Sequence, residues 1–142
     1  MIASLIALAL VAAPLPNHES TPEAAAASFL EAFKSMDEVR FDTFFAPDVT
    51  MFFPDGPFPN GRVEGRDAVL SAFHRFFKLV KERGRTTLNI VPLEQRVHRY
   101  GDLAIVTFQL DGEDSVGRRS IVLRKLGNEW RIAHFHASTH DE

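Results

Sequence analysis

Trp130-Arg131-Ile132-Ala133-His134-Phe135-His136-Ala137-Ser138 is the stretch of this chain that decides how its fold is interpreted. Side chains alternate between the two faces of a β-strand, so the even-numbered residues are predicted to share one face. That face begins with a large aromatic and a branched aliphatic residue and ends with two imidazoles and a hydroxyl. A row that changes from apolar to polar indicates a cavity with an apolar floor and a polar wall.

The composition indicates one globular domain with an aromatic core. Of the 142 residues, 45% are hydrophobic and 25% are charged, which is ordinary for a globular protein. The chain has 13 Phe but only one Trp and one Tyr, and Phe fills space without offering a polar group. The net charge of −3 provides no basic surface for nucleic acid or an anionic membrane. The absence of Cys excludes disulfides, thiol nucleophiles and thiolate metal sites.

The start of the chain has the pattern of a secretory signal. Residues 1–13 read MIASLIALALVAA, an uncharged apolar run shorter than the roughly 20 residues that span a bilayer. Val11 and Ala13 have the small-residue spacing of a cleavage site. Residues 1–16 are therefore predicted to be a signal peptide with a short linker, and residues 17–142 the domain. The expected location is secreted or periplasmic, and the alternative is a cytoplasmic protein with a hydrophobic extension of its first helix.

The N-terminal half is predicted to be mainly helical. The Thr-Pro-Glu sequence at 21–23 supplies an N-cap, a proline at the first helical position and an acid in the first turn of a helix that ends near Ser35. A short second helix is predicted to carry Phe44 and Phe45. It stops before Pro47, because helix is disfavoured at the residue preceding a proline. The remaining segments expected here are a strand at 49–53, a loop at 54–64 and a long helix at 65–83.

The C-terminal half is predicted to be a meander of antiparallel strands. Gly127-Asn128 suits a two-residue hairpin turn, and Pro92 marks a bulge or bend. Helices followed by strands indicate an α+β fold with the helices on one face of a curved sheet. The expected strands span residues 86–98, 103–110, 118–126 and 129–138.

Four motifs occur in order along the chain: Phe53-Pro54-Asp55-Gly56, Gly65-Arg66-Asp67-Ala68, Gly101-Asp102-Leu103-Ala104 and the segment Gly127 to Ser138. With the order of elements, they resemble the SnoaL-like group of the NTF2-like superfamily over about residues 21–139. The resemblance implies a cone in which three helices from the N-terminal half pack on a strongly curved, mostly antiparallel sheet that encloses an apolar pocket. Members often pair through the outer face of the sheet. Their activities range from isomerases and dehydratases to binding modules without catalysis, so the fold decides little about the chemistry.

The hairpin turn also predicts which residues lie together at the polar end of the cavity. A two-residue turn at Gly127-Asn128 places Arg119 opposite His136, and directly opposed side chains share a face. Arg119 is therefore expected beside His134, His136 and Ser138. This expectation holds only if the pairing continues without a slip, because a shift of one residue moves every side chain to the other face.

The neighbouring strand and the opposite face complete the predicted site. Gln109 is expected to point into the cavity together with Thr107. The other face of the last strand carries Ala133, Phe135 and Ala137, which are small or apolar. This face is expected to form the contact of a homodimer.

Four residues are candidates for catalysis. Histidine exchanges its proton near neutral pH, so His134 and His136 are candidate general acids or bases. Arg119 would stabilise an anion or hold a neighbouring imidazole neutral. Asp55 is a further candidate base, although a turn-forming role is the favoured interpretation, and a structural role is the alternative for either histidine. No metal is expected, because no carboxylate accompanies the histidines and Arg119 would repel a cation.

The leading hypothesis is an exported domain that binds a small, largely apolar molecule in its pocket without a cofactor. The expected partners are that ligand and a second copy of the chain, with no nucleic acid and no membrane contact once the protein is mature. One alternative is a metal-free lyase or isomerase of the dehydratase type with a pocket histidine as general base. The other is a non-catalytic dimeric binding or assembly module. The residues predicted to bind the ligand are Trp130, Ile132, Ser138, Phe33, Phe53, Phe73 and Gln109.

Overall fold

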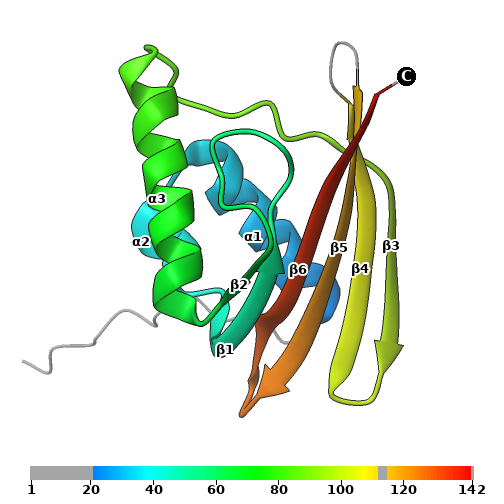
Figure 1. Ribbon diagram of the computed structural model, residues 1–142. Helices are drawn as coiled ribbons and strands as arrows, with labels where there is room; N and C mark the ends of the chain where they lie inside the picture. The colour runs from blue at the N-terminus through cyan, green and yellow to red at the C-terminus, as the bar shows by residue number, and fades with distance from the viewer. Residues whose placement is uncertain (1–20, 112–114, 142) are drawn as a thin grey trace, which may run out of the picture.

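The computed structural model describes residues 21–111 and 115–141, and in this part of the chain helices cover one face of a single sheet (Figure 1). The helices are α1 (Pro22–Ser35), α2 (Glu38–Asp42) and α3 (Arg66–Glu82). The strands are β1 (Phe45–Phe52), β2 (Arg62–Glu64), β3 (Pro92–Tyr100), β4 (Leu103–Asp111), β5 (Ser115–Leu126) and β6 (Glu129–Asp141).

The sheet is mixed but mostly antiparallel. Its strand order is β2-β1-β6-β5-β4-β3, and among the strand pairs of the described residues only β1–β6 is parallel. Strands β3 to β6 are consecutive in the sequence and form a meander. Strand β1, which follows α2 in the sequence, pairs with β6. This arrangement confirms the predicted α+β fold.

Helices α1 and α3 begin where predicted, to within one residue, but the second helix is shorter than predicted. The Thr21 side chain caps α1 by accepting a hydrogen bond from the Ala24 amide at 3.2 Å. Helix α2 ends at Asp42, so the prediction that Phe44 and Phe45 belong to it is wrong. Phe45 instead begins β1 and pairs with Ile132 of β6. Pairing with the sheet outweighs the local helical pattern at this point.

The strands also differ from the prediction in several places, and β5 and β6 each extend three residues beyond the predicted bounds, to Ser115 and Asp141. Strand β2, which has three residues, lies within the segment predicted to be a loop, and it forms by pairing with β1. Strand β3 begins at Pro92, so residues 86–91 precede it as an irregular segment. An irregularity between Leu93 and Arg96 in the β3–β4 ladder lies beside the bend predicted at Pro92. The Gly127-Asn128 turn is confirmed, because Leu126 pairs with Glu129 across it.

The core between the helices and the sheet is built largely from phenylalanine. Phe41 of α2 is fully buried, and its ring centroid lies 4.8 Å from that of Phe73 on α3 and 5.1 Å from that of Phe45 on β1. Phe29 of α1 lies 5.9 Å from Phe135 of β6 in an edge-to-face arrangement. These ring contacts are within the favourable range for aromatic pairs. They fix all three helices against the sheet.

A β-bulge in β6 determines which side chains face the helices. In the β5–β6 ladder Leu123 pairs with Ile132, as the two-residue turn requires, but the next pair is Val122 with His134. Ala133 is therefore an extra residue without a partner on β5, and the alternation of faces changes phase at this point. The residues that face inward are Trp130 and Ile132 before the bulge and Phe135 and Ala137 after it.

The bulge makes part of the predicted register wrong. Beyond Ile132, the imidazoles of His134 and His136 lie on the outer face, and Phe135 and Ala137 lie on the helix-covered face, with 3% and 4% of their surfaces exposed. Arg119 is paired with Ala137 and not with His136.

Candidate ligand-binding cavity

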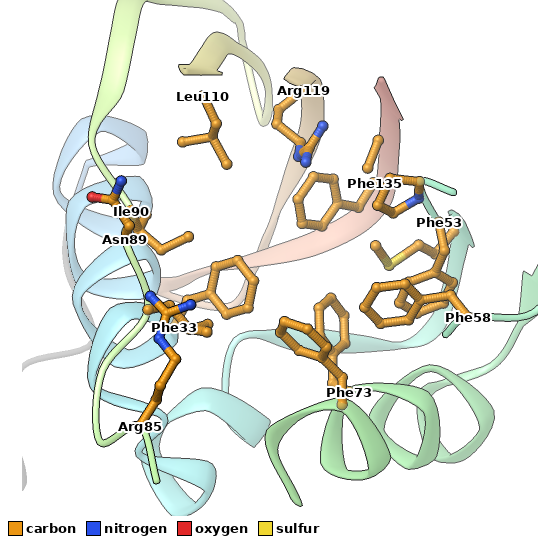
Figure 2. Close-up of a pocket in the computed structure, with 15 residues that line it drawn as sticks. Phe33, Phe53, Phe58, Phe73, Arg85, Asn89, Ile90, Leu110, Arg119 and Phe135 are labelled. Atoms are coloured by element: carbon orange, nitrogen blue, oxygen red, sulfur yellow. The ribbon is translucent and has the colours of Figure 1, made fainter. Parts of the chain in front are cut away.

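A cavity of about 270 Å³ lies between the helices and the inner face of the sheet (Figure 2). Most of its lining is aromatic or aliphatic, and the polar exceptions are Arg85, Asn89 and Arg119. An apolar concavity with a few polar groups is the usual form of a small-molecule site. The lining residues are Phe33, Met51, Phe53, Pro54, Phe58, Phe73, Phe76, Arg85, Leu88, Asn89, Ile90, Leu110, Arg119, Phe135 and Ala137.

Aromatic side chains from separate elements form one wall of the cavity. Phe53, at the end of β1, stacks on Phe58 of the following loop with ring centroids 4.8 Å apart and planes 13° apart. The Phe53 ring also contacts Phe73 of α3 at 5.1 Å. Phe58 packs at the same distance against Phe76, one turn further along α3. Because the loop supplies Phe58, it closes the cavity on the side next to α3.

Arg119 is the polar group that β5 directs into the cavity, and Figure 2 shows its guanidinium close to Phe135. Its Nη1 donates hydrogen bonds to the carbonyl oxygens of Arg118 and Ser138, both at 2.9 Å. Burial lowers the pKa of Arg119 from its usual value, although an arginine remains charged. The site therefore holds a fixed positive charge in largely apolar surroundings.

The irregular segment before β3 forms the opposite rim. Leu88 is buried, and its amide donates a hydrogen bond to the Lys34 carbonyl of α1 at 2.8 Å. Arg85 and Asn89, on either side of it, are exposed and lie on the side of the cavity away from Phe53 and Phe58 (Figure 2). The rim is thus polar and reaches solvent, whereas the interior is apolar.

The two histidines lie outside the cavity, on the outer face of the sheet. His134 Nδ1 lies 2.7 Å from the Thr50 hydroxyl, in a hydrogen bond between β6 and β1. The ring of Phe52 lies 6.1 Å from that of His134 and 5.6 Å from that of His136. Burial, and then repulsion by His136, lower the pKa of His134, while Thr50 acts in the opposite direction. The prediction that these imidazoles form a polar wall of the cavity is wrong because of the bulge.

The other predicted site residues are divided between the cavity, the core and the surface. Phe33, Phe53 and Phe73 line the cavity, and their part in ligand binding stays a prediction. Trp130 and Ile132 are buried in the core but are not among the lining residues. Ser138 and Gln109 are corrections, because both follow the outer face of the sheet. Asp55 is exposed on the loop after β1, next to the lining residue Pro54, and its role as a base stays a prediction.

Several lining residues were missed because they depend on tertiary packing. Phe58, Arg85 and Asn89 belong to irregular segments, whose side-chain directions follow no periodicity. Leu110 was missed because Thr107 and Gln109 were predicted to point inward, which would turn Leu110 to the other face of the sheet. The observed pairing of Val106 with Ile121 and the burial of Ala104, Val106 and Phe108 reverse that choice.

A second polar cluster, absent from the predictions, joins two helices at the surface. The Nε2 atom of His74 on α3 lies 2.7 Å from a carboxylate oxygen of Asp42 at the end of α2. Arg66 donates a hydrogen bond to the Asp42 carbonyl at 2.8 Å. These contacts fix α2 against α3. Within residues 21–111 and 115–141 no group of three or more His, Asp or Glu is arranged to hold a metal ion.

Solved structures share this fold at low sequence identity. An NTF2-like protein of unknown function from Pseudomonas putida is 18% identical, with a TM-score of 0.69 over 82% of each chain. A candidate dehydratase of the NTF2-like family from Streptomyces avermitilis is 19% identical, with a TM-score of 0.68 over 84% of this chain and 94% of that one. A candidate ketosteroid isomerase from Parabacteroides distasonis is 21% identical, with a TM-score of 0.64 over 86% and 89%. At these identities the likeness shows the fold alone.

Comparison at the level of sequence gives the family but no characterised relative. No curated protein matches the chain. None of the helices in the described ranges has the length and apolarity needed to cross a bilayer. The sequence profile of the SnoaL-like domain matches residues 23–142, which include every described helix and strand except the first residue of α1. The chain therefore belongs to the SnoaL-like domain family and has the NTF2-like fold.

Proposed function

We propose that this protein binds a small, largely apolar molecule in the cavity between its helices and its sheet. The observation that carries the proposal is the lining, which is apolar apart from three residues and leaves about 270 Å³ unfilled. The cavity is open to solvent at its rim, so its apolar lining is in contact with water, which is unfavourable. An apolar ligand would remove this surface from water.

The alternative is an acid–base lyase or isomerase. It is suggested by two of the similar structures, the candidate dehydratase and the candidate ketosteroid isomerase. The geometry gives it less support. The described lining contains no Asp, Glu, His, Lys or Tyr, so it offers no ordinary general base. Arg119 is the charged group nearest the interior, and an arginine does not deprotonate at neutral pH.

Native mass spectrometry of the protein isolated from its source cells tests the proposal. We expect a mass above that of the polypeptide, which denaturation releases as a small molecule. Ala137→Leu should reduce the occupied fraction several-fold, because the larger side chain fills the cavity. Ser138→Leu is the matched control, since the neighbouring side chain follows the outer face and should leave occupancy unchanged. An unliganded wild-type protein, or equal occupancy in both variants, would contradict the proposal.

We also propose that two copies of the chain associate through the outer face of the sheet. On this face a row runs across the strands from Ile105 through Val122 to His134. Ile105 exposes 38% of its surface, which is unusual for a branched aliphatic residue in the middle of a sheet. The predicted contact through Phe135 and Ala137 is replaced by this row, because the bulge turns those two residues inward.

Export stays a prediction, because residues 1–20 lie outside the described part of the chain. We propose that the protein is released as a mature form after cleavage near residue 13. N-terminal sequencing of the protein from cell fractions tests this. A mature N-terminus in the secreted or periplasmic fraction supports export, and an intact Met1 in the cytoplasmic fraction contradicts it.

A further inference from the structure

The charge balance of the cavity identifies the kind of ligand that it would accept, provided that the proposed function is correct. Two of the lining residues are arginines, and none of the described lining residues is acidic. Arg85 is exposed at the rim, where water can solvate it. Arg119 is partly buried beside apolar side chains, where a charge is costly unless it is paired.

The hydrogen bonds of Arg119 use only one side of its guanidinium. Both bonds come from Nη1 and go to main-chain carbonyls, which carry no negative charge. Within the described residues, Nε and Nη2 donate to no protein acceptor, and no carboxylate forms an ion pair with this side chain. The free Nε–Nη2 edge is the one with which arginine binds a carboxylate through two parallel hydrogen bonds.

The backbone holds the guanidinium in this position. A Cβ atom added at Gly117, two residues earlier on β5, would lie 3.0 Å from both Nη1 and Nη2. The absence of a side chain at Gly117 thus leaves the space that the guanidinium occupies. The carbonyls of Arg118 and Ser138 fix its orientation from β5 and β6. A group held in place before binding loses little freedom when a ligand arrives.

We propose that the cavity selects amphiphilic carboxylates, with the carboxylate on the free edge of Arg119 and the apolar body against the phenylalanine wall. The aromatic pair Phe53 and Phe58 lies across the cavity from Arg85 and Asn89, so the wall offers flat surfaces away from the polar rim (Figure 2). A volume of about 270 Å³ is at the small end for ligand pockets, which favours a compact body such as a fused ring or a medium-length chain.

Matched pairs of probes test this proposal. Binding of 2-naphthoate and 2-naphthol, and of decanoate and decanol, to the full-length chain is measured by isothermal titration calorimetry at pH 7.5. We expect the carboxylate of each pair to bind about 10- to 100-fold more tightly than the alcohol, as a charge-assisted hydrogen-bonded pair predicts. Arg119→Gln should abolish this preference while the alcohols still bind. Arg118→Gln, which changes the neighbouring arginine on the outer face, should keep it.

Two further variants cover the case in which Arg119→Gln does not fold. Arg119→Lys keeps the charge but cannot form two parallel hydrogen bonds, so the preference should fall without disappearing. Gly117→Ala should reduce it by displacing the guanidinium, with little effect on the melting temperature because the end of a flexible side chain can move.

The outcomes distinguish the two proposals. If neither member of either pair binds the wild-type protein, the ligand-binding function itself is wrong. If carboxylate and alcohol bind equally, or if Arg119→Lys and Gly117→Ala retain the full preference, the cavity still binds ligands and the selection of carboxylates is wrong.

Discussion

At the scale of single residues, His134 makes the stability of the protein depend on pH. Burial and the neighbouring His136 hold the pKa of His134 below its usual value, so the unfolded chain takes up a proton more readily than the folded one. The contribution of neutral His134 to the free energy of unfolding is therefore fully present above about pH 6.5, the usual pKa of histidine. It is lost as the pH falls through the lower pKa that His134 has in the folded state.

We expect the free energy of unfolding to decrease between pH 7.5 and pH 5, and His134→Gln to make that decrease smaller. Urea denaturation followed by circular dichroism at several pH values measures the slope. His98→Gln controls for the loss of an imidazole, because His98 is exposed on β3, at the far end of the same cross-strand row. The same slope in wild type and His134→Gln would show that this imidazole is not responsible.

At the scale of elements, the bulge at Ala133 explains why the predicted and the observed sites differ, because it reverses the faces of the β6 residues that follow it. Deletion of Ala133 should leave every other side chain of β6 on its present face, because it removes the residue that has no partner on β5. Deletion of Arg131 should instead turn Ile132 outward, since it shifts a regularly paired part of the strand.

We expect the Ala133 deletion to unfold cooperatively with a loss of about 1–3 kcal/mol, and the Arg131 deletion to lose cooperative unfolding. Urea denaturation of both variants, followed by the fluorescence of Trp130, makes the comparison. If the Ala133 deletion fails to fold and the Arg131 deletion folds, the described register of β6 is wrong.

The elements that were predicted correctly are those whose signals are local. The Thr21 cap of α1 and the Gly127-Asn128 turn depend on residues within a few positions, and both lie where the sequence placed them. Phe33, Phe53 and Phe73 were predicted to line the cavity, and they do, because the burial of large apolar side chains is favourable. Arg119 lies in the cavity too, but against Ala137 and not beside an imidazole.

The rest could not be read from the chain because it depends on pairing between distant segments. The alternation in His134-Phe135-His136-Ala137 allows either the histidines or Phe135 and Ala137 to face the helices. Only the pairing with β5 and β1 decides which pair faces inward. Strand β2 exists through its pairing with β1, and its three residues have no pattern of their own. Arg85 and Asn89 reach the cavity because Leu88 anchors their segment to α1.

At the scale of the whole molecule, the outer face of the sheet predicts the oligomeric state. If two copies associate through the row of Ile105, Val122 and His134, a carboxylate at its centre should prevent association at pH 7.5. It would be buried as a charge, and the lowered pKa of the neighbouring His134 leaves that imidazole neutral at this pH. Val122→Asp is therefore expected to halve the mass measured by light scattering. Val39→Asp is the control, because Val39 on α2 exposes 84% of its surface and lies away from the sheet.

A wild-type protein with a monomer mass at every concentration would rule out the dimer. A dimer that persists in Val122→Asp would place the interface on another surface of the molecule.

The bulge also determines how tolerance to mutation should vary along β6. Before Ala133, polar replacements should be harmful at even positions, where Trp130 and Ile132 are buried. After it, the harmful positions should be odd, where Phe135 and Ala137 face the cavity. A saturation scan of the strand would thus record a period of two residues that is interrupted at Ala133. Substitutions at Phe135 and Ala137 would also report on ligand binding, and substitutions at His134 on self-association.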